Sequence, residues 1–255
     1  RRHYGWAWYQ RKFTLPAFCA GQRVVLRFGS VTHTAKVWLN GQLIAQHKGG
    51  FTPFEADVTN LLRPGETALL TVACDNRVNH STLPVGNEDG QLAFFGSDNA
   101  GIPSVEAAKR AAAPQNRPNF DFFNYAGIHR PVVLYTTPKE YIEDVTVVPA
   151  VDGTVQYAVK TTGSAPVHVT VLDADGNAVA SAEGAAGTLT IPAVHLWEPR
   201  PGTPYLYTLH ITCGGDIYDQ TFGVRSIEVK GTQVLLNGKP LYFKGFCKHE
   251  DFTAH

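Results

Sequence analysis

The first half of the chain alternates between apolar and polar residues over short stretches. The stretches with this period of two are residues 8–15, 23–31, 34–47 and 67–76. Alternation at every second residue is typical of β-strands that bury one face. Asn40-Gly41 interrupts the third stretch, and this dipeptide favours a type I′ turn because both central residues of that turn need a positive φ. The pattern therefore predicts antiparallel strands with a tight hairpin at Asn40-Gly41.

Shorter strands and more regular turns are predicted after Pro138. Roughly seven alternating stretches fit within roughly 90 residues there, which is the number that an immunoglobulin-like sandwich needs. Asp173, Asp175 and Asn177 are spaced as in a calcium loop, but Gly176 is misplaced for such a loop and no Glu closes it. We therefore predict a hairpin turn at Asp175-Gly176 and an all-β chain of two sandwich domains.

A long stretch inside the first domain departs from the alternation. Residues 85–119 are rich in Gly, Asn, Asp and Pro, and Ser104 is suited to cap a short helix over residues 105–113. A loop of this length inside a compact domain is typically either functional or disordered.

The C-terminal stretch carries a second hairpin signal and a cluster of charges. Asn237-Gly238 favours another tight turn, and the apolar residues 241–247 after it predict a short strand. Four charged or titratable residues follow that strand, namely Lys248, His249, Glu250 and Asp251. Barrel enzymes collect such residues at the ends of their strands, so this cluster is a candidate site.

Composition and charge exclude several classes of function. The chain has 22 Lys and Arg against 22 Asp and Glu, and no apolar run reaches the roughly 20 residues of a membrane span. We therefore expect a soluble protein without nucleic-acid or membrane partners. No phosphate-binding loop, Gly-x-Ser-x-Gly elbow or His-Glu-x-x-His pair occurs, so no metal or cofactor is expected. The four cysteines lack metal or redox spacing; we expect free, buried thiols and a cytoplasmic location.

One aspartate stands in an unusual setting. Asp121 lies among Phe120, Phe122 and Phe123, directly before an apolar stretch that predicts a strand over residues 131–137. A carboxylate loses solvation among aromatic rings, so it must be hydrogen-bonded or face a polar cavity. From the residues alone, a turn or cap and a ligand contact are equally good interpretations. Aromatic rings also cover the apolar faces of sugars, although a core or edge position is the better explanation for Trp8, Tyr9, Phe122 and Phe123.

Several motifs together carry a resemblance to a known family. They are "WYQRKF", "VTHTAKVWLNGQ", "GGFTPFEADVT", "DFFNYAGIHR", "LWEP", "FGVRSIEV" and "LLNGKPLYFKGFCKHED". In the residues of these motifs and in their order along the chain, the sequence resembles the N-terminal half of family 2 glycoside hydrolases, and the β-glucuronidases most of all. The resemblance covers essentially the whole chain.

The resemblance implies three domains. Residues 1–138 would form a jelly-roll sugar-binding domain with one further strand before residue 1, and residues 139–229 an immunoglobulin-like sandwich. Residues 230–255 would form the lead-in hairpin and the first strand of a (β/α)8 barrel, which takes about 250 residues when complete. Both catalytic glutamates of the retaining mechanism belong to the rest of that barrel. Asn87-Glu88 fits the family's Asn-Glu dipeptide but follows no barrel strand, so we assign it no catalytic role.

The resemblance also assigns roles to particular residues. Asp121 and His249 would contact the sugar, although His249 fits equally well a hydrogen bond that orients a catalytic residue. Residues in support of Asp121 would be Phe122, Phe123, Asn124, Tyr125 and Gly127. The implied function is the accessory half, inactive alone, of a homo-oligomeric hydrolase of β-glucuronides. The alternatives are a β-galactosidase or β-mannosidase of the same family, a carbohydrate-binding module without activity, and an adhesion sandwich.

Overall fold

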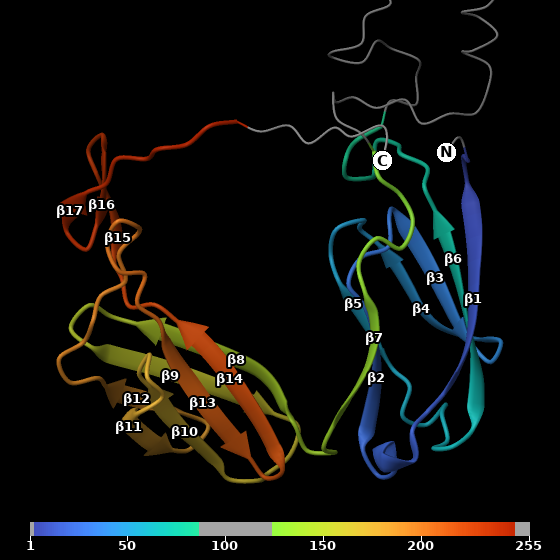
Figure 1. Cartoon of the computed structure of the whole chain (residues 1–255), viewed down its shortest axis with the longest axis horizontal. Coiled ribbons are helices and arrows are strands. Elements are labelled where there is room, and N and C mark those ends of the chain that lie inside the picture. Colours follow the sequence, from blue (N-terminus) through green and yellow to red (C-terminus); the bar gives the residue numbers. More distant parts are fainter. Residues whose placement is uncertain (1–2, 87–123, 248–255) are drawn as a thin grey trace, which may run out of the picture. The chain divides into compact units, whose positions relative to one another are not determined.

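The chain folds into two compact units made almost wholly of β-strands. The computed structural model describes residues 3–86 and 124–247, and the division between the units falls between Thr136 and Thr137. Within the described residues, the one helical element is a 3-10 turn, η1 (Ala17–Cys19). The predicted all-β fold is confirmed (Figure 1). No helix in the described ranges is long and apolar enough to cross a membrane.

The first unit is a sandwich of two sheets. One sheet has the strand order β1 (Trp6–Thr14), β6 (Thr67–Asp75), β3 (Thr34–Leu39) and β4 (Gln42–Lys48). The other has the order β5 (Phe54–Asp57), β2 (Arg23–Phe28) and β7 (Val132–Thr137). Neighbouring strands β3 and β6 are distant in sequence, and so are β1 and β6, so the first sheet joins residues from both ends of the first 75.

Alternation along the strands builds the core of this unit. On β3, Ala35, Val37 and Leu39 are buried while the residues between them are partly exposed. Phe28 of β2 stacks on Phe54 of β5 with ring centroids 4.8 Å apart. Each strand thus gives one face to the space between the sheets, as the period of two predicts.

The predicted hairpin at Asn40-Gly41 is confirmed. Asn40 has φ 49° and Gly41 has φ 85°, as a type I′ turn between β3 and β4 requires. The Asn40 side chain also makes a hydrogen bond, in which its Oδ1 accepts from the Leu69 N–H at 2.8 Å. The turn is therefore fastened to β6 as well.

The second unit contains a seven-stranded sandwich, the number of strands that an immunoglobulin-like domain requires. One sheet has the order β11 (Ala178–Glu183), β10 (Val167–Leu172), β13 (Tyr207–Cys213) and β14 (Asp216–Phe222). The other has the order β12 (Ala186–Thr190), β9 (Thr154–Thr161) and β8 (Ile142–Pro149). Their inner faces enclose a core that includes Val155, Val171, Leu209 and Ile211.

The loop with calcium-like spacing is a hairpin turn, as predicted. Gly176 has φ 85°, and the Asp173 N–H donates to the Asn177 carbonyl at 2.9 Å. The Asp173 carboxylate accepts hydrogen bonds from the Asn177 side chain and from backbone N–H groups, which lowers the pKa of Asp173. No group of three His, Cys, Asp or Glu suited to a metal occurs among the described residues.

The C-terminal stretch differs from its prediction. The hairpin at Asn237-Gly238 forms within a small sheet of β15 (Ile227–Lys230), β16 (Gln233–Leu236) and β17 (Lys239–Pro240). The strand expected over residues 241–247 does not form in the described part of the chain. Its aromatic residues Tyr242, Phe243 and Phe246 are exposed. A strand needs a neighbour for its backbone groups, and no neighbouring strand is present among the described residues.

The thiols follow the prediction in three cases of four. All four cysteines are free; Cys19, Cys74 and Cys213 are buried, whereas Cys247 is exposed. Cys247 belongs to the stretch that forms no strand, which explains its exposure.

Candidate functional site

The segment before β7 is fastened to the loop between β2 and β3. The Thr32 N–H donates to the Gly127 carbonyl at 3.0 Å, and the Gly127 N–H donates to the Thr32 carbonyl at 3.3 Å. Gly127 has φ 99°, and a Cβ there would lie 3.1 Å from the Tyr9 hydroxyl. The backbone conformation therefore favours glycine at this position, and an added Cβ would also crowd the Tyr9 hydroxyl.

A buried histidine extends this connection to Asn124. His33 is 1% exposed, and its Nε2 lies 3.0 Å from the Asn124 Oδ1. Because an amide oxygen only accepts, Nε2 carries the hydrogen of the neutral ring. Nδ1 is buried and has no hydrogen-bond partner among the described residues. Burial lowers the pKa of His33 and outweighs its hydrogen bond to Asn124 and the charge of Asp75.

A second histidine, His129, takes part in a network of four contacts that lies beside His33. The two ring nitrogens of His129 lie 3.0 Å from the hydroxyls of Ser30 and Thr32. Each hydroxyl also donates to the Gly50 carbonyl. The network therefore ties the 30–32 loop both to Gly50 and to His129.

Glycine lets the chain approach this network closely. A Cβ on Gly50 would lie 2.9 Å from the Thr32 Cγ2 and 3.1 Å from the His33 Nδ1. On the far side, the Cys74 thiol donates to the Thr32 carbonyl, and the His33 N–H donates to the Asp75 carbonyl at 2.7 Å. The His33 ring is thus enclosed by β6, by Gly50 and by Asn124.

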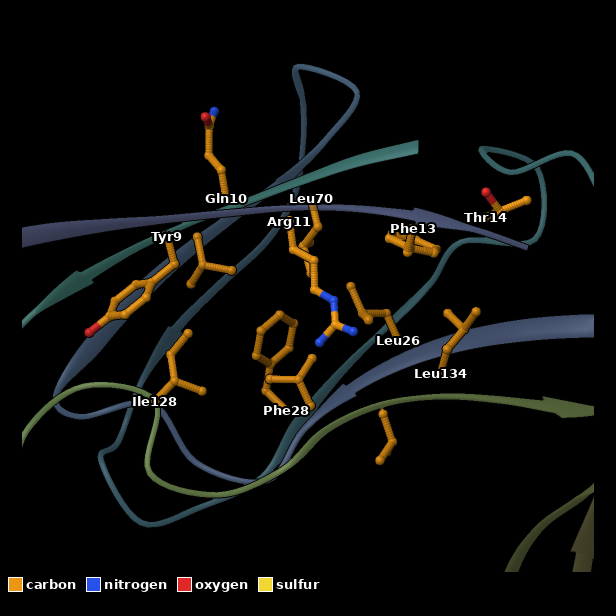
Figure 2. A pocket seen from close by; sticks show the side chains of 13 residues that line it. Tyr9, Gln10, Arg11, Phe13, Thr14, Leu26, Phe28, Leu70, Ile128 and Leu134 are labelled. Carbon is orange, nitrogen blue, oxygen red and sulfur yellow. The ribbon is translucent and has the colours of Figure 1, made fainter. Parts of the chain in front are cut away.

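An apolar groove opens between the two sheets of the first unit. It has a volume of about 540 Å³ and runs between β1 and β7, over core residues such as Phe28 and Leu70. Figure 2 shows Tyr9 and Arg11 of β1 on one side of it and Ile128 and Leu134 on the other. Arg11 is the only charged residue of the described chain in its lining. The described lining of the groove therefore offers no carboxylate for general acid catalysis.

The aromatic residues considered for sugar contacts do not line one pocket. Tyr9 lines the groove, whereas Trp8 lies on β1 with 64% of its surface exposed and stacks on Trp38 with ring centroids 5.4 Å apart. Consecutive strand residues point to opposite faces, which separates these two side chains. Their interpretation as edge residues fits the described structure.

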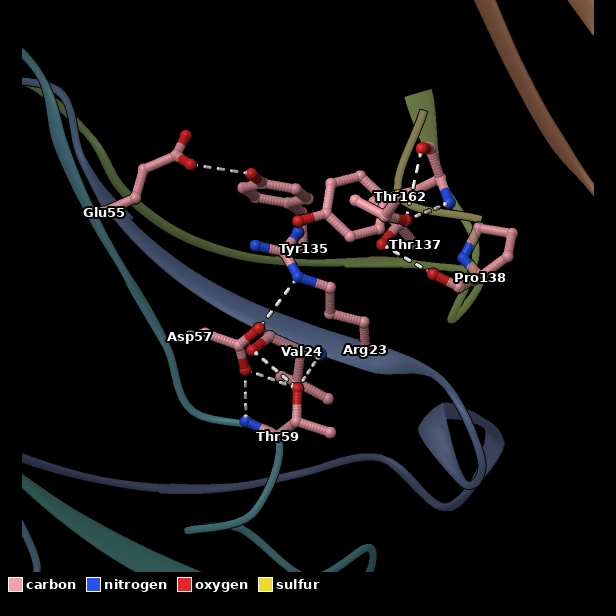
Figure 3. A network of polar contacts seen from close by, with 10 residues as sticks. Arg23, Val24, Glu55, Asp57, Thr59, Tyr135, Thr137, Pro138 and Thr162 are labelled. Carbon is pink, nitrogen blue, oxygen red and sulfur yellow. Dashed lines mark hydrogen bonds and ion pairs between the residues drawn. The ribbon is translucent and has the colours of Figure 1, made fainter. Parts of the chain in front are cut away.

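A polar network fastens the strands of the other sheet (Figure 3). Arg23 of β2 donates to Asp57 at 2.8 Å, and the Tyr135 hydroxyl of β7 donates to Glu55 of β5 at 2.9 Å. The Thr59 hydroxyl donates to Asp57 and accepts from the Val24 N–H. Burial of the Asp57 carboxyl would raise its pKa, but the hydrogen bonds from Thr59 and Arg23 outweigh burial and lower that pKa. This network lies at the first residue of β2, Arg23. Ser30 and Thr32 follow the last residue of the same strand.

The predicted site residues divide into two groups. Asn124, Tyr125 and Gly127 are described, and two of them, Asn124 and Gly127, bind the 30–33 loop directly. The positions outside the described residues are Asp121, Phe122, Phe123 and His249, together with the helix expected after Ser104. Sequence reasoning gave no role to Ser30, Thr32, His33 or His129, although "VTHTAKVW" and "AGIHR" contain three of them.

Comparison with known proteins assigns the chain to a family. Residues 1–138 match the model described as the sugar binding domain of glycosyl hydrolases family 2, and residues 140–225 match a second model of the same family. The chain belongs to glycosyl hydrolase family 2. The sequence resemblance to this family is therefore confirmed.

Relatives of this family 2 chain include several β-glucuronidases. It is 39% identical over 262 residues to the β-glucuronidase of Paenibacillus borealis, covering 98% of the chain and 41% of that relative. Against the human β-glucuronidase the identity is 39% over 275 residues, covering 98% of the chain and 40% of the relative. The chain thus spans about two-fifths of the length of the curated relatives it matches.

Solved structures agree with these relatives. The Faecalibacterium prausnitzii β-glucuronidase is 94% identical with a TM-score of 0.94, covering 100% of this chain and 43% of that one. The Ruminococcus gnavus β-glucuronidase in complex with D-glucuronic acid is 36% identical with a TM-score of 0.80, covering 96% of this chain and 41% of that one.

Proposed function

We propose that this chain is the accessory, non-catalytic half of a retaining β-glucuronidase that removes terminal β-D-glucuronic acid. The observation that carries this proposal is the 94% identity to the F. prausnitzii β-glucuronidase over the whole chain. The confirmed family and the coverage of about two-fifths of each relative support it.

The chemistry of the described residues supports the accessory role. A retaining glycosidase needs two carboxyl groups about 5–5.5 Å apart on either side of the scissile bond. Glu143 and Asp144 are adjacent acids in a small cavity of about 140 Å³, but Lys160 forms an ion pair with Glu143 at 2.9 Å. The larger groove is lined by no carboxylate of the described residues. Neither cavity of the described residues thus offers a free pair of carboxyl groups, and the proposal places the catalytic pair outside this chain.

Asp121 and His249 remain the residues proposed to contact the sugar. In this proposal the jelly roll presents Asp121 to the pocket of a barrel, and residues 230–255 begin that barrel. The full-length protein is proposed to be a homo-oligomer, with a β-glucuronide as its substrate. The R. gnavus relative in complex with D-glucuronic acid supports this class of substrate.

Hydrolysis of paired chromogenic substrates tests the proposal. The full-length protein and this 255-residue chain are each assayed with p-nitrophenyl β-D-glucuronide and p-nitrophenyl β-D-galactoside. We expect turnover of the glucuronide by the full-length protein alone. Preference for the galactoside would overturn the substrate, and turnover by the 255-residue chain would overturn the accessory role.

A further inference from the structure

The outer face of the four-stranded sheet in the first unit carries a cluster of tryptophans. Trp6 and Trp8 belong to β1 and Trp38 to β3, two strands that flank β6 (Figure 1). Successive residues of a strand point to opposite faces, so Trp8 and the groove residue Tyr9 lie on different sides of the sheet. The tryptophans are therefore separate from the groove and belong to an open face.

The small side chain of Ala73 lets aromatic rings meet across β6. Ala73 pairs with Trp8 of β1 on one side and with Lys36 of β3 on the other. A methyl group leaves space above the central strand, and the rings of Trp8 and Trp38 stack with centroids 5.4 Å apart and an angle of 26° between their planes. Trp8 nevertheless has 64% of its surface exposed. The stacked pair thus forms a nearly flat aromatic surface that a ligand can reach.

Two lysines add positive charge to this face. The Lys36 Nζ lies 5.6 Å from the centre of the Trp6 ring, and Lys12 follows Trp8 at the even spacing that keeps a residue on the same face of β1. Neither lysine forms an ion pair within the described residues of the first unit. The cations that do pair with carboxylates there are Arg23, Arg27, Arg63 and Arg77.

Negative charge is nearly absent from the same sheet. Its four strands contain a single acidic residue, Asp75. Asp75 is 7% exposed, and its carboxylate accepts hydrogen bonds from the Arg77 guanidinium at 2.9 Å. The charges of Lys12 and Lys36 are therefore not neutralised by their own sheet, and the face attracts anionic groups.

A sugar chain that carries carboxylates matches both features of the face. Pyranose rings have an apolar side of C–H groups that an indole covers, and a uronic acid carboxylate pairs with an ammonium group. Gln10, which donates to the Thr71 hydroxyl at 3.0 Å, adds amide and hydroxyl groups that can bind sugar hydroxyls. A second copy of the chain suits the face less well, because a two-fold contact would bring the lysines of both copies together.

We propose that this face is a non-catalytic binding site for acidic oligosaccharides that contain β-linked uronic acid residues. Trp8 and Trp38 hold the sugar rings, and Lys12 and Lys36 hold the carboxylates. The choice of uronic acid rests on the proposed function, since a β-glucuronidase acts on molecules that contain this sugar. No bond forms or breaks at this face, which retains a sugar chain while the full-length protein hydrolyses a terminal residue elsewhere.

Calorimetric titration of the full-length protein with a hyaluronan hexasaccharide tests the site. This chain alternates glucuronic acid with N-acetylglucosamine, and the form with N-acetylglucosamine at its non-reducing end offers no terminal glucuronide to the catalytic site. Chitohexaose, a neutral chain of N-acetylglucosamine of the same length, is the matched ligand without carboxylates. We expect the acidic chain to bind about tenfold more tightly, and added salt to reduce that difference.

Two substitutions in the face and two outside it locate the binding. Trp8→Ala removes the exposed ring, and Lys36→Gln removes a charge. Phe18→Ala and Arg63→Gln are their controls, because Phe18 is 78% exposed, the Arg63 side chain is 80% exposed, and both lie outside the four strands. We expect the affinity for the acidic chain to fall about tenfold in Trp8→Ala and about threefold in Lys36→Gln, and to stay unchanged in both controls.

Several results would overturn the proposal. Equal affinity of Trp8→Ala and Phe18→Ala would exclude the site, and equal affinity of the wild type for the two hexasaccharides would exclude an acidic ligand. Binding by the 255-residue chain but not by the full-length protein would show that the rest of the polypeptide or a second copy covers the face. A smaller sedimenting species in Trp8→Ala than in the wild type would identify the second copy as that occupant.

The proposed function is tested separately from this site. If the full-length protein does not hydrolyse p-nitrophenyl β-D-glucuronide, the proposed function is wrong. The titrations still decide whether the face binds an acidic sugar chain, because they measure affinity and not turnover.

Discussion

Thr32 and Gly127 exchange two backbone hydrogen bonds, of 3.0 and 3.3 Å, between loops that belong to distant parts of the sequence. This pairing adds a short bridge beyond the ends of β2 and β7. Beside this bridge, His33 and Asn124 are joined by a side-chain hydrogen bond as well.

Replacement of Gly127 should show how closely the two loops approach. Gly127→Ala places a Cβ at φ 99° and 3.1 Å from the Tyr9 hydroxyl, and we expect a loss of about 1–3 kcal/mol in the free energy of unfolding. Urea unfolding of this 255-residue chain, followed by tryptophan fluorescence, measures it.

Gly21→Ala is the matched control, because Gly21 also has a positive φ but nothing lies within 4 Å of its Cβ position. Adding Tyr9→Phe to Gly127→Ala should recover part of the loss by removing the oxygen. No recovery would mean that the backbone conformation alone carries the cost.

Asn40 tests the hairpin in a similar way. Asn40→Gly keeps a residue suited to φ 49° but loses the hydrogen bond from the Leu69 N–H. Asn40→Ala loses this hydrogen bond and also places a residue that is poorly suited to a positive φ. The expected order of stability is wild type, then Gly, then Ala, with Asn40→Gly costing about 1 kcal/mol and Asn40→Ala about 1–2 kcal/mol more. Thermal unfolding measures the order; equal stability of the two variants would contradict a role for φ.

The stability of the first unit should depend on pH through His33. Burial lowers the pKa of His33 from 6.5, and Asp75 and His129 are the charged or titratable groups that act on it, in opposite directions. Below about pH 6.5 the unfolded chain binds a proton that the folded chain does not. The free energy of unfolding therefore falls with falling pH, by at most about 1.4 kcal/mol per pH unit from this group.

His33→Gln removes this contribution. Between pH 6.5 and the lowered pKa of the folded state, the variant should lose stability less steeply than the wild type in urea unfolding at a series of pH values. Identical slopes would show that the His33 pKa is not lowered in the folded chain.

Thiol reactivity should distinguish one cysteine from the other three. Burial raises the pKa of the Cys74 thiol to about 11 and also raises the pKa of Cys213, while Cys247 is exposed. The thiolate is the reactive form, so at pH 8 a disulfide reagent such as DTNB should label one thiol rapidly in the folded chain and four after denaturation. Cys247→Ser should abolish the rapid phase; a rapid phase that persists would contradict the burial of the others.

Most of the fold was predictable from patterns among residues that are close in sequence. The turns at Asn40-Gly41 and Asn237-Gly238 were predictable because each depends on two residues whose φ is positive, and the turn at Asp175-Gly176 because Gly176 supplies the positive φ. The strand over residues 241–247 was predicted from the same kind of pattern and does not form in the described chain, because a strand also needs a neighbour.

The site was less accessible from sequence. The contacts of His33 with Asn124, and of His129 with Ser30 and Thr32, join positions far apart in the chain. Periodicity and turn chemistry report only on neighbours in sequence, so they give no sign of such pairs. The motifs that contain these residues were recognised, but only the folded chain brings them together.

Covalent trapping tests the central proposal most directly. A retaining β-glucuronidase forms a glycosyl-enzyme intermediate, and 2-deoxy-2-fluoro-β-D-glucuronosyl fluoride slows its hydrolysis enough for the labelled peptide to be identified by mass spectrometry. The full-length protein should carry one label, on a glutamate beyond residue 255, and the 255-residue chain should carry none. A label on any Asp or Glu within these 255 residues would contradict the accessory role.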